Sequence, residues 1–281
     1  MPSPTTKEWA SLTLLVENDW GEFGTGFLVS KEFDSGDENY FIKHMYLVTN
    51  KHVIGSTKQL RDDVESIKLY GDFVEDGESK KFILDLEINP GGIQEHPSPD
   101  VDVAAIRATG LFKRFPETKN KCIPITAIKS PSELATLNIG AGDRVLIYGY
   151  PGGIAHANIN APFIRTGIIS SQLGEPLVDQ VDDEGQSRVR TIKGFLVDGG
   201  VVPGQSGSPV IWEPPVVERE NSGLVWRNRS PELIGIIAET RYAPIDSGMI
   251  KLEGFAGLGL AFDADTIKET IELFDECQTS E

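Results

Sequence analysis

The hydrophobic positions of this chain fall into short runs, many of which alternate with polar positions, and glycine or proline stands between successive runs. Successive side chains of a strand point to opposite faces, so a period of two indicates strands with one buried face. Many short strands between turn residues are typical of all-β proteins. The pattern predicts strands over Ser11–Val16, Gly26–Ser30, Tyr46–Thr49, Ser66–Tyr70, Phe82–Ile88, Val101–Arg107, Arg144–Tyr148, Thr191–Val197, Pro209–Trp212 and Leu233–Glu239.

One segment has a different period. In Asp265–Glu276 the apolar residues Ile267, Ile271 and Phe274 recur at helical spacing, which predicts a helix near the C-terminus. A side-chain oxygen of Asp263 or Asp265 is expected to cap its first turn.

Three stretches between the predicted strands are longer than a tight turn requires. We expect Glu32–His44, Asp179–Arg190 and Glu213–Pro231 to be surface insertions, the second of them a charged hairpin tip.

The bulk properties narrow the class of protein. A chain of 281 residues forms one large all-β domain or two small ones. Its net charge of −17 disfavours nucleic acid and anionic membranes as partners. No apolar run approaches the ~18 residues that span a bilayer, and the start lacks the basic and apolar regions of a secretory signal. Only Cys122 and Cys277 could form a disulfide, so we expect a reducing compartment, the cytoplasm.

The candidate chemistry centres on Gly204–Pro209, which reads Gly-Gln-Ser-Gly-Ser-Pro. Such a sequence could form an ordinary turn, but it also suits a serine nucleophile whose neighbouring amides converge on a substrate oxygen. A serine needs a base, and His52, which follows an apolar run, is the candidate among four histidines. Asp102 is the candidate to orient it. The order His52, Asp102, Ser206 is one of the known chain orders of a serine triad.

Another aspartate and other serine-hydrolase arrangements fit this constellation less well. Asp100 would lie on the same strand face as Asp102, but it follows a proline where a strand begins, and Asp102 heads the pattern Asp-Val-Ala-Ala-Ile. An α/β-hydrolase requires a histidine after the nucleophile, and none follows His156. A subtilisin order would place the acid before the histidine. No metal-binding pattern such as His-Glu-x-x-His is present, so neither metal nor cofactor is expected.

Together these motifs resemble the chymotrypsin-fold (trypsin-like) serine proteases, and most closely the bacterial HtrA/Deg type. The resemblance covers most of residues 20–270. It rests on the motifs around the three candidate residues and on five further segments in the family's order, which are Gly24–Ser30, Gly149–Gly153, Thr166–Ser170, Asp198–Ser206 and Leu258–Phe262.

The resemblance implies a fold of two six-stranded antiparallel Greek-key β-barrels with a C-terminal helix and no PDZ domain. It places the N-terminal barrel in residues 1–125, the C-terminal barrel in 126–262, and the helix and tail in 263–281. It implies that the amides of Gly204 and Ser206 form an oxyanion hole. The substrate pocket would lie between Gly199-Gly200-Val201 and Ala238-Glu239-Thr240.

The implied function is serine endopeptidase activity on a protein or peptide substrate. Gly200 stands six residues before Ser206, where trypsin-like enzymes carry an acid that binds basic side chains, so small or medium apolar side chains are the expected preference. Glu239 could instead reach the pocket and favour a basic residue. Two departures from the family pattern are Ser208, in place of a second glycine, and Ala238, in place of a serine that supports the aspartate. A silent or partner-activated peptide-binding module and an esterase remain as alternatives, and the sequence leaves open whether an activating partner or oligomerisation is needed.

Overall fold

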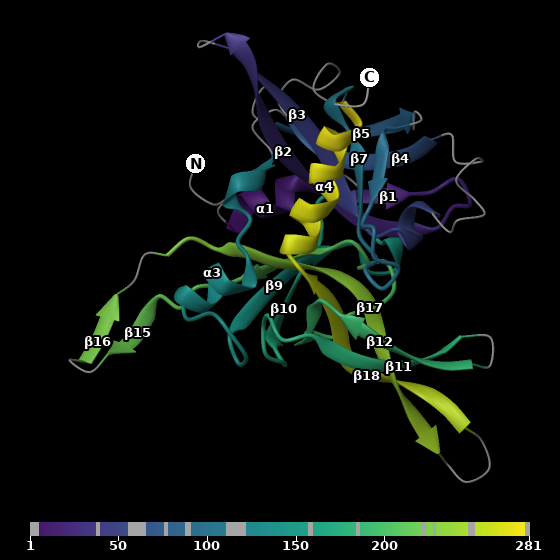
Figure 1. Ribbon diagram of the computed structural model, residues 1–281, viewed down its shortest axis with the longest axis vertical. Helices are drawn as coiled ribbons and strands as arrows, with labels where there is room; N and C mark the ends of the chain where they lie inside the picture. The colour runs from purple at the N-terminus through teal and green to yellow at the C-terminus, as the bar shows by residue number, and fades with distance from the viewer. Residues whose placement is uncertain are drawn as a thin grey trace.

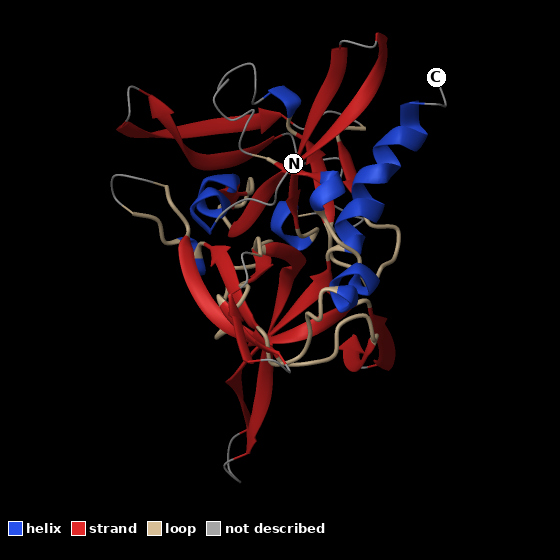
Figure 2. Cartoon of the chain, turned by 90° about the vertical axis from the view of Figure 1, so that its left-hand side faces the viewer, coloured by secondary structure: helices blue, strands red, loops and turns tan. Residues whose placement is uncertain are grey.

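The computed structural model describes residues 6–37, 40–55, 66–75, 78–87, 91–110, 122–156, 160–183, 186–220, 223–226, 229–246 and 251–278. Strands dominate, and they form two groups stacked on each other, as both views show (Figures 1 and 2).

The first half of the chain forms one sheet with the strand order β5-β4-β1-β2-β3-β7-β6, in which β8 adds to β2 in parallel. The strands are β1 (Thr13–Glu17), β2 (Phe23–Asp37), β3 (Tyr40–Thr49), β4 (Ser66–Glu75), β5 (Glu78–Glu87), β6 (Ile93–Glu95), β7 (Ala104–Arg107) and β8 (Ile123–Pro124).

The second half forms a closed six-stranded barrel in the order β10-β13-β18-β17-β14-β9. Its strands are β9 (Arg144–Gly149), β10 (Phe163–Ile169), β13 (Gly194–Asp198), β14 (Pro209–Trp212), β17 (Glu232–Asp246) and β18 (Lys251–Asp263). Two separate hairpins project from it (Figure 1): β11 (Leu177–Asp183) with β12 (Gln186–Ile192), and β15 (Val217–Glu220) with β16 (Gly223–Trp226).

The described helices are short or terminal. They are α1 (Thr6–Leu12), α3 (Pro131–Thr136) and α4 (Asp265–Gln278), with 3-10 turns η1 (His52–Ile54), η3 (Ile125–Ala127) and η4 (Pro151–Gly153). Ser130 and Glu133 cap α3 reciprocally, each side chain binding the other's backbone amide. The all-β class with a C-terminal helix is therefore confirmed. The second barrel is closed and has the six strands predicted, whereas the first half forms an eight-stranded sheet with one parallel pair, β2 with β8.

Each predicted strand overlaps an observed one, but the structure has features that the hydrophobic pattern did not show. The run predicted over Thr191–Val197 is broken at Lys193, where β12 ends and β13 begins. The Glu213–Pro231 insertion contains the β15–β16 hairpin. The predicted cap of α4 is not formed: Thr266 Oγ1 donates to the backbone oxygen of Asp263 (2.7 Å), and neither aspartate side chain accepts a hydrogen bond from another described residue.

The largest hydrophobic core joins both halves of the chain to α4. It contains Phe27 and Tyr46 from the first sheet, Tyr148 and Phe262 from the second barrel, and Phe274 from α4, all at most 1% exposed. Each half also has a smaller cluster of its own. Because apolar burial is the main favourable term in folding, this shared cluster fixes the two halves against each other.

Candidate active site

His52 stands where the first sheet ends its third strand. β3 stops at Thr49, and the chain turns through η1, which Gly55 closes with φ of +71°. Val53 and Ile54 are buried beneath this turn, while the His52 side chain stays half-exposed above it. The buried neighbours anchor the turn and leave the imidazole accessible.

Asp102 holds His52 through both carboxylate oxygens. Oδ2 hydrogen-bonds to His52 Nδ1, and Oδ1 accepts the backbone N–H of His52 at 3.2 Å. Asn50 Nδ2 donates to the backbone oxygen of Asp102 at 2.6 Å, which ties the strand end to the histidine turn. The structure thus brings Asp102 rather than Asp100 against the imidazole. With Nδ1 engaged, Nε2 is the ring nitrogen left for other chemistry.

The charges around His52 shift its protonation. Burial acts to lower the pKa of His52, but the hydrogen bond and negative charge of Asp102 act in the other direction, and Glu239 and Glu22 add to them. The net effect is a pKa above the usual value of 6.5.

Ser206 lies in a tight turn with Gly207, just before β14. Its Oγ donates to the backbone oxygen of Ala238 on β17 at 3.2 Å, and among the described residues it forms no hydrogen bond with His52. Its own backbone oxygen accepts the amide of Thr25 from β2 at 2.8 Å. Gly207 packs so closely against Thr25 and Thr49 that a Cβ there would lie 1.8 Å from the Thr25 oxygen. The serine loop is therefore pressed against the strands that lead to His52.

The backbone of the serine loop is fixed by its carbonyls. Pro203 O accepts from Gly152 N at 2.8 Å, Gly204 O from Thr25 Oγ1 at 2.9 Å, and the oxygen of Gln205 from Ser208 N at 3.0 Å. In contrast, the amides of Gly204 and Ser206 donate to no other residue in the described part of the chain. With each carbonyl tied down, these two N–H groups are the polar groups of the loop that remain for a ligand oxygen.

The conformation of the loop requires glycine at position 204. Gly204 has φ of +88°, and a Cβ there would lie 2.5 Å from Tyr150 O and 2.7 Å from Gly152 N. The neighbouring Gln205 is fully buried, and its Oε1 accepts the amide of Val202 at 2.9 Å. The side chain of Gln205 thus supports the loop from inside the protein.

Thr25 is the functional candidate that sequence reasoning missed. Besides the two bonds it donates to Ser206 and Gly204, its Oγ1 accepts Tyr150 N at 3.2 Å, and its backbone oxygen accepts Thr49 Oγ1 at 2.7 Å. Thr25 therefore links the first sheet to the serine loop of the second barrel. The sequence signalled only a Gly-Thr-Gly strand, because partners up to 179 residues away leave no local pattern.

The first side of the predicted substrate pocket, Gly199-Gly200-Val201, is mostly buried. Val201 is 1% exposed and packs on Gly259, so its side chain belongs to the core. Gly199 is buried too, whereas Gly200 is half-buried, with φ of +61° and its amide bound to Gly257 O. A Cβ on Gly200 would lie 2.6 Å from Nη2 of Arg165. This side of the predicted pocket is therefore formed by backbone.

The opposite side is the strand β17. Ala238 is a bulged residue there, since the register with β18 shifts between Ile237 and Glu239. β14 pairs with β17 only as far as Ile236, so from Ala238 through Thr240 this edge carries no other strand of the described chain. The edge is available for an extended segment.

Glu239 is already neutralised by a neighbouring arginine. Arg190 on β12 binds both its carboxylate oxygens at 2.7 Å, and Arg190 also contacts Asp179, which Arg241 contacts in turn. The hydrogen bond with Glu239 is the main cause that raises the pKa of Arg190, and the two arginines lower that of Asp179 despite its burial. The side chain of Glu239 is therefore held toward the β11–β12 hairpin.

The described residues place limits on other kinds of site. Among them no group of three or more histidine, cysteine or acidic side chains is arranged to hold a metal ion. None of the helices in the described ranges is long and apolar enough to cross a bilayer.

The two-part β fold is that of the chymotrypsin-fold peptidases. The pattern of the trypsin-like peptidase domain matches residues 24–213, a range that contains His52, Asp102 and Ser206, and the chain belongs to this family. Among solved structures, Deg5 superposes with a TM-score of 0.51 at 16% identity, over 95% of this chain and 91% of its own, which supports the fold.

The Rv3671c protease from M. tuberculosis is a second structural neighbour. Its active form has a TM-score of 0.49 at 15% identity, over 96% of this chain and 83% of its own. No curated protein matches the chain significantly in sequence.

Proposed function

We propose that the chain is a serine endopeptidase. Ser206 Oγ attacks the scissile carbonyl, and His52 Nε2 takes the serine proton and delivers it to the leaving amine as the C–N bond breaks. The acyl-enzyme that results is hydrolysed by water, which His52 activates in the same way. Asp102 keeps the imidazole in the tautomer that presents Nε2. The amides of Gly204 and Ser206 stabilise the negative charge on the carbonyl oxygen, and such a donor is worth about 3 kcal/mol of barrier. No cofactor takes part.

The observation that carries this proposal is the pairing of two features. The carboxylate of Asp102 hydrogen-bonds to both Nδ1 and the backbone N–H of His52. In the Ser206 loop, the amides of Gly204 and Ser206 have no acceptor in the described part of the protein. A surface turn of Gly and Ser would satisfy its polar groups locally or in water. It would not need the carbonyls of Pro203, Gly204 and Ser206 to be hydrogen-bonded to other elements.

The substrate in this proposal is an extended peptide in the cytoplasm. Its strand adds to the open edge of β17 at Ala238–Arg241, and its scissile bond lies over Ser206. Because Arg190 already neutralises Glu239, small or medium apolar side chains are favoured over basic ones beside the scissile bond.

A second candidate is a peptidase that needs a partner or substrate to become active. The Ser206 hydroxyl donates to Ala238 O and not to His52. The hydrogen bond along which the serine proton would pass to His52 is therefore absent in this conformation. Activation in this scheme requires the Ser206 hydroxyl to leave Ala238 O and to reach Nε2 of His52.

The first test is labelling of the purified chain with a fluorophosphonate probe. The native chain and Ser208→Ala should be labelled, because Ser208 is fully buried and bears no part of the chemistry. Ser206→Ala and His52→Ala should not be labelled. Equal labelling of the native chain and Ser206→Ala would refute the assignment of the nucleophile. Labelling that appears only after a peptide or candidate partner is added would identify the second candidate.

Peptide-bond cleavage is tested separately. Denatured casein is incubated with the native chain or with Ser206→Ala, and mass spectrometry identifies new termini. Termini that only the native chain produces support an endopeptidase. A labelled serine that produces no termini but hydrolyses a nitrophenyl ester would point to an esterase instead.

A further inference from the structure

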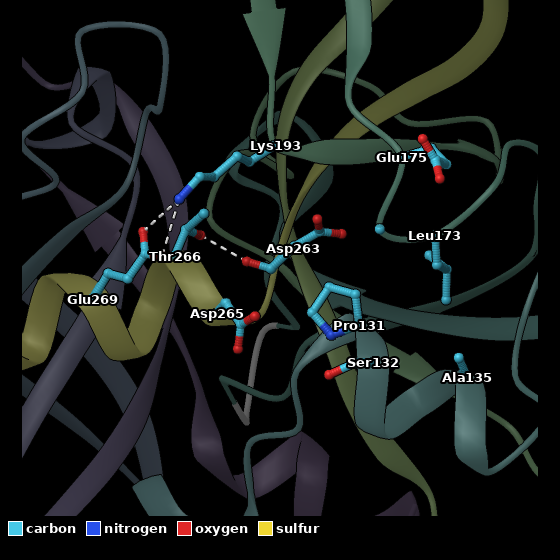
Figure 3. A pocket seen from close by; sticks show the side chains of 11 residues that line it. Pro131, Ser132, Ala135, Leu173, Glu175, Lys193, Asp263, Asp265, Thr266 and Glu269 are labelled. Carbon is cyan, nitrogen blue, oxygen red and sulfur yellow. Dashed lines mark hydrogen bonds and ion pairs between the residues drawn. The ribbon is translucent and has the colours of Figure 1, made fainter.

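A cavity of about 440 Å³ lies away from the candidate active site, where β18 meets α4 (Figure 3). Three segments line it: the start of α3, the loop before β11, and the β18–α4 junction beside the break at Lys193. Neither His52 nor Ser206 belongs to its lining, so it requires its own explanation.

The lining is strongly acidic. Four lining residues contribute carboxylates: Glu175, Asp263, Asp265 and Glu269. Among the lining residues, Lys193 alone is basic. Lys193 Nζ is already engaged by Glu269, at 3.0 and 3.2 Å. Three carboxylates thus share the cavity without a cation of the described chain bonded to them. This charge disfavours an anionic ligand.

Asp263 is the least compensated of these carboxylates. The residue is 8% exposed, yet its side chain forms no hydrogen bond or ion pair with other described residues. Its backbone is fully used, since N donates to Lys193 O and O accepts from Thr266 Oγ1. Figure 3 shows the carboxylate directed into the space between Glu175, Leu173 and Pro131.

The position near a helix start does not explain this carboxylate. A capping aspartate accepts hydrogen bonds from the first amides of the helix, and a cap stabilises the charged form. Asp263 accepts none, and burial, followed by repulsion from Asp265, raises its pKa to about 6 despite the charge of Lys193. Burial raises the pKa of Asp265 too. Burying a carboxylate without a partner is costly, and a ligand cation would offset that cost.

We propose that this acidic cavity binds an organic cation, an alkyl ammonium or guanidinium group on an aliphatic stem, with Asp263 as its principal partner. The head group lies among Asp263, Asp265 and Glu175, and the stem lies along Leu173. A metal ion fits poorly, because no three acidic, histidine or cysteine side chains of the described residues converge as a metal requires. A guanidinium spreads five N–H donors over a plane and matches carboxylates that are set apart. The volume lies at the small end of ligand pockets, which suits a ligand of amino-acid size.

The test is calorimetric titration of the full chain with n-butylguanidinium and, as a neutral isostere, n-butylurea. Binding of the cation without binding of the urea is expected. Asp263→Asn should weaken the affinity at least tenfold. Asp19→Asn, an exposed aspartate elsewhere, removes the same charge and should leave the affinity unchanged. Equal losses in the two variants, or equal binding of butylurea, would overturn the proposal, because the chain's overall negative charge would then suffice.

The pH dependence provides an independent readout. Asp263 must be ionised to bind a cation, so the affinity should fall about tenfold from pH 7.5 to pH 5. Asp265, Glu175, Glu269 and Lys193 face the same space, and the comparison with Asp263→Asn isolates the part due to Asp263. An affinity that stays constant over this range would contradict the proposal.

A second titration distinguishes the source of the cation. N-acetyl-arginine amide carries the same head group within a peptide backbone. Binding tighter than that of n-butylguanidinium would indicate an arginine side chain of a partner polypeptide, and weaker binding would indicate a free small molecule. Because the readout is binding, Ser206→Ala should give the same affinity as the native chain. A failure here is thus separate from a failure of the peptidase proposal.

Discussion

The hydroxyl of Thr25 offers the sharpest test of how the serine loop is held. Thr25→Val keeps the shape of the side chain but removes the donor to Gly204 O and the acceptor of Tyr150 N. Thr25 is fully buried, so no water replaces these bonds. Each backbone group left without a partner costs about 1–3 kcal/mol. The loop can avoid part of that cost only by moving Gly204, which would take its amide away from the position proposed for the substrate oxygen.

The expected result is a large loss of reactivity with a moderate loss of stability. Losing one oxyanion donor costs roughly 10²–10³ in rate, so the second-order rate of fluorophosphonate labelling should fall by about 100-fold in Thr25→Val. Thr25→Ser keeps the hydroxyl and should stay within a few-fold of the native rate. Urea titration should show a loss of about 2 kcal/mol in the free energy of unfolding of Thr25→Val.

A matched control distinguishes an effect on the serine loop from a general loss of stability. Thr270 is equally buried, and its hydroxyl donates to Thr266 O within α4, far from the serine loop in sequence. Thr270→Val should lose stability but label at the native rate. If Thr25→Val also labelled at the native rate, the hydroxyl would not position Gly204 and the reasoning would fail.

Three further predictions follow from the charges. Because only neutral imidazole accepts a proton, labelling should increase with pH around a midpoint above 6.5, and Asp102→Asn should lower that midpoint and cut the rate by about 10⁴-fold. Glu239→Gln breaks the bidentate pair with Arg190, so amide hydrogen exchange in β12 should become faster, and unchanged exchange would show that the pair does not hold the hairpin. Asp263 has a pKa of about 6 in the folded protein, against an ordinary value of 3.8, so its ionisation destabilises the fold. This destabilisation is absent below about pH 4 and complete above pH 6. Asp263→Asn should therefore raise the free energy of unfolding by up to about 3 kcal/mol at pH 8 and leave it unchanged near pH 4, as urea titrations at both pH values would show.

The strands and the terminal helix were predictable because they depend on local periodicity. Ile267, Ile271 and Phe274 are buried in α4, as their spacing predicts, and Pro209–Trp212 is β14. The break at Lys193 was missed because Ile192 before it and Phe195–Val197 after it are apolar, and hydropathy does not record a change of sheet. The bulge at Ala238 likewise depends on the partner strand and not on its own sequence.

The candidate site was predictable where chemistry confines the residue type. A serine in the sequence Gly-Gln-Ser-Gly and a histidine after an apolar strand are visible in the sequence, and the structure brings His52 and Asp102 together. Period-two reasoning could not separate Asp102 from Asp100, since both would share a strand face. Their difference arises from the tertiary contacts of Asp102 with His52 and Asn50. The anchoring by Thr25 and the neutralisation of Glu239 by Arg190 are also long-range, so a single sequence carries no sign of them.

The shared core has a consequence for the order in which this protein is made. Phe274 of α4 packs against Tyr46 of β3, with ring centroids 4.9 Å apart, and α4 also contacts β6 and β7 of the first sheet. The N-terminal sheet therefore cannot complete its core on the ribosome until α4 has been synthesised. Because β3 leads into His52 and β7 follows Asp102, we expect the pair to be held firmly only after α4 has emerged. The candidate catalytic pair thus depends on a helix that the ribosome makes after the strands of both halves.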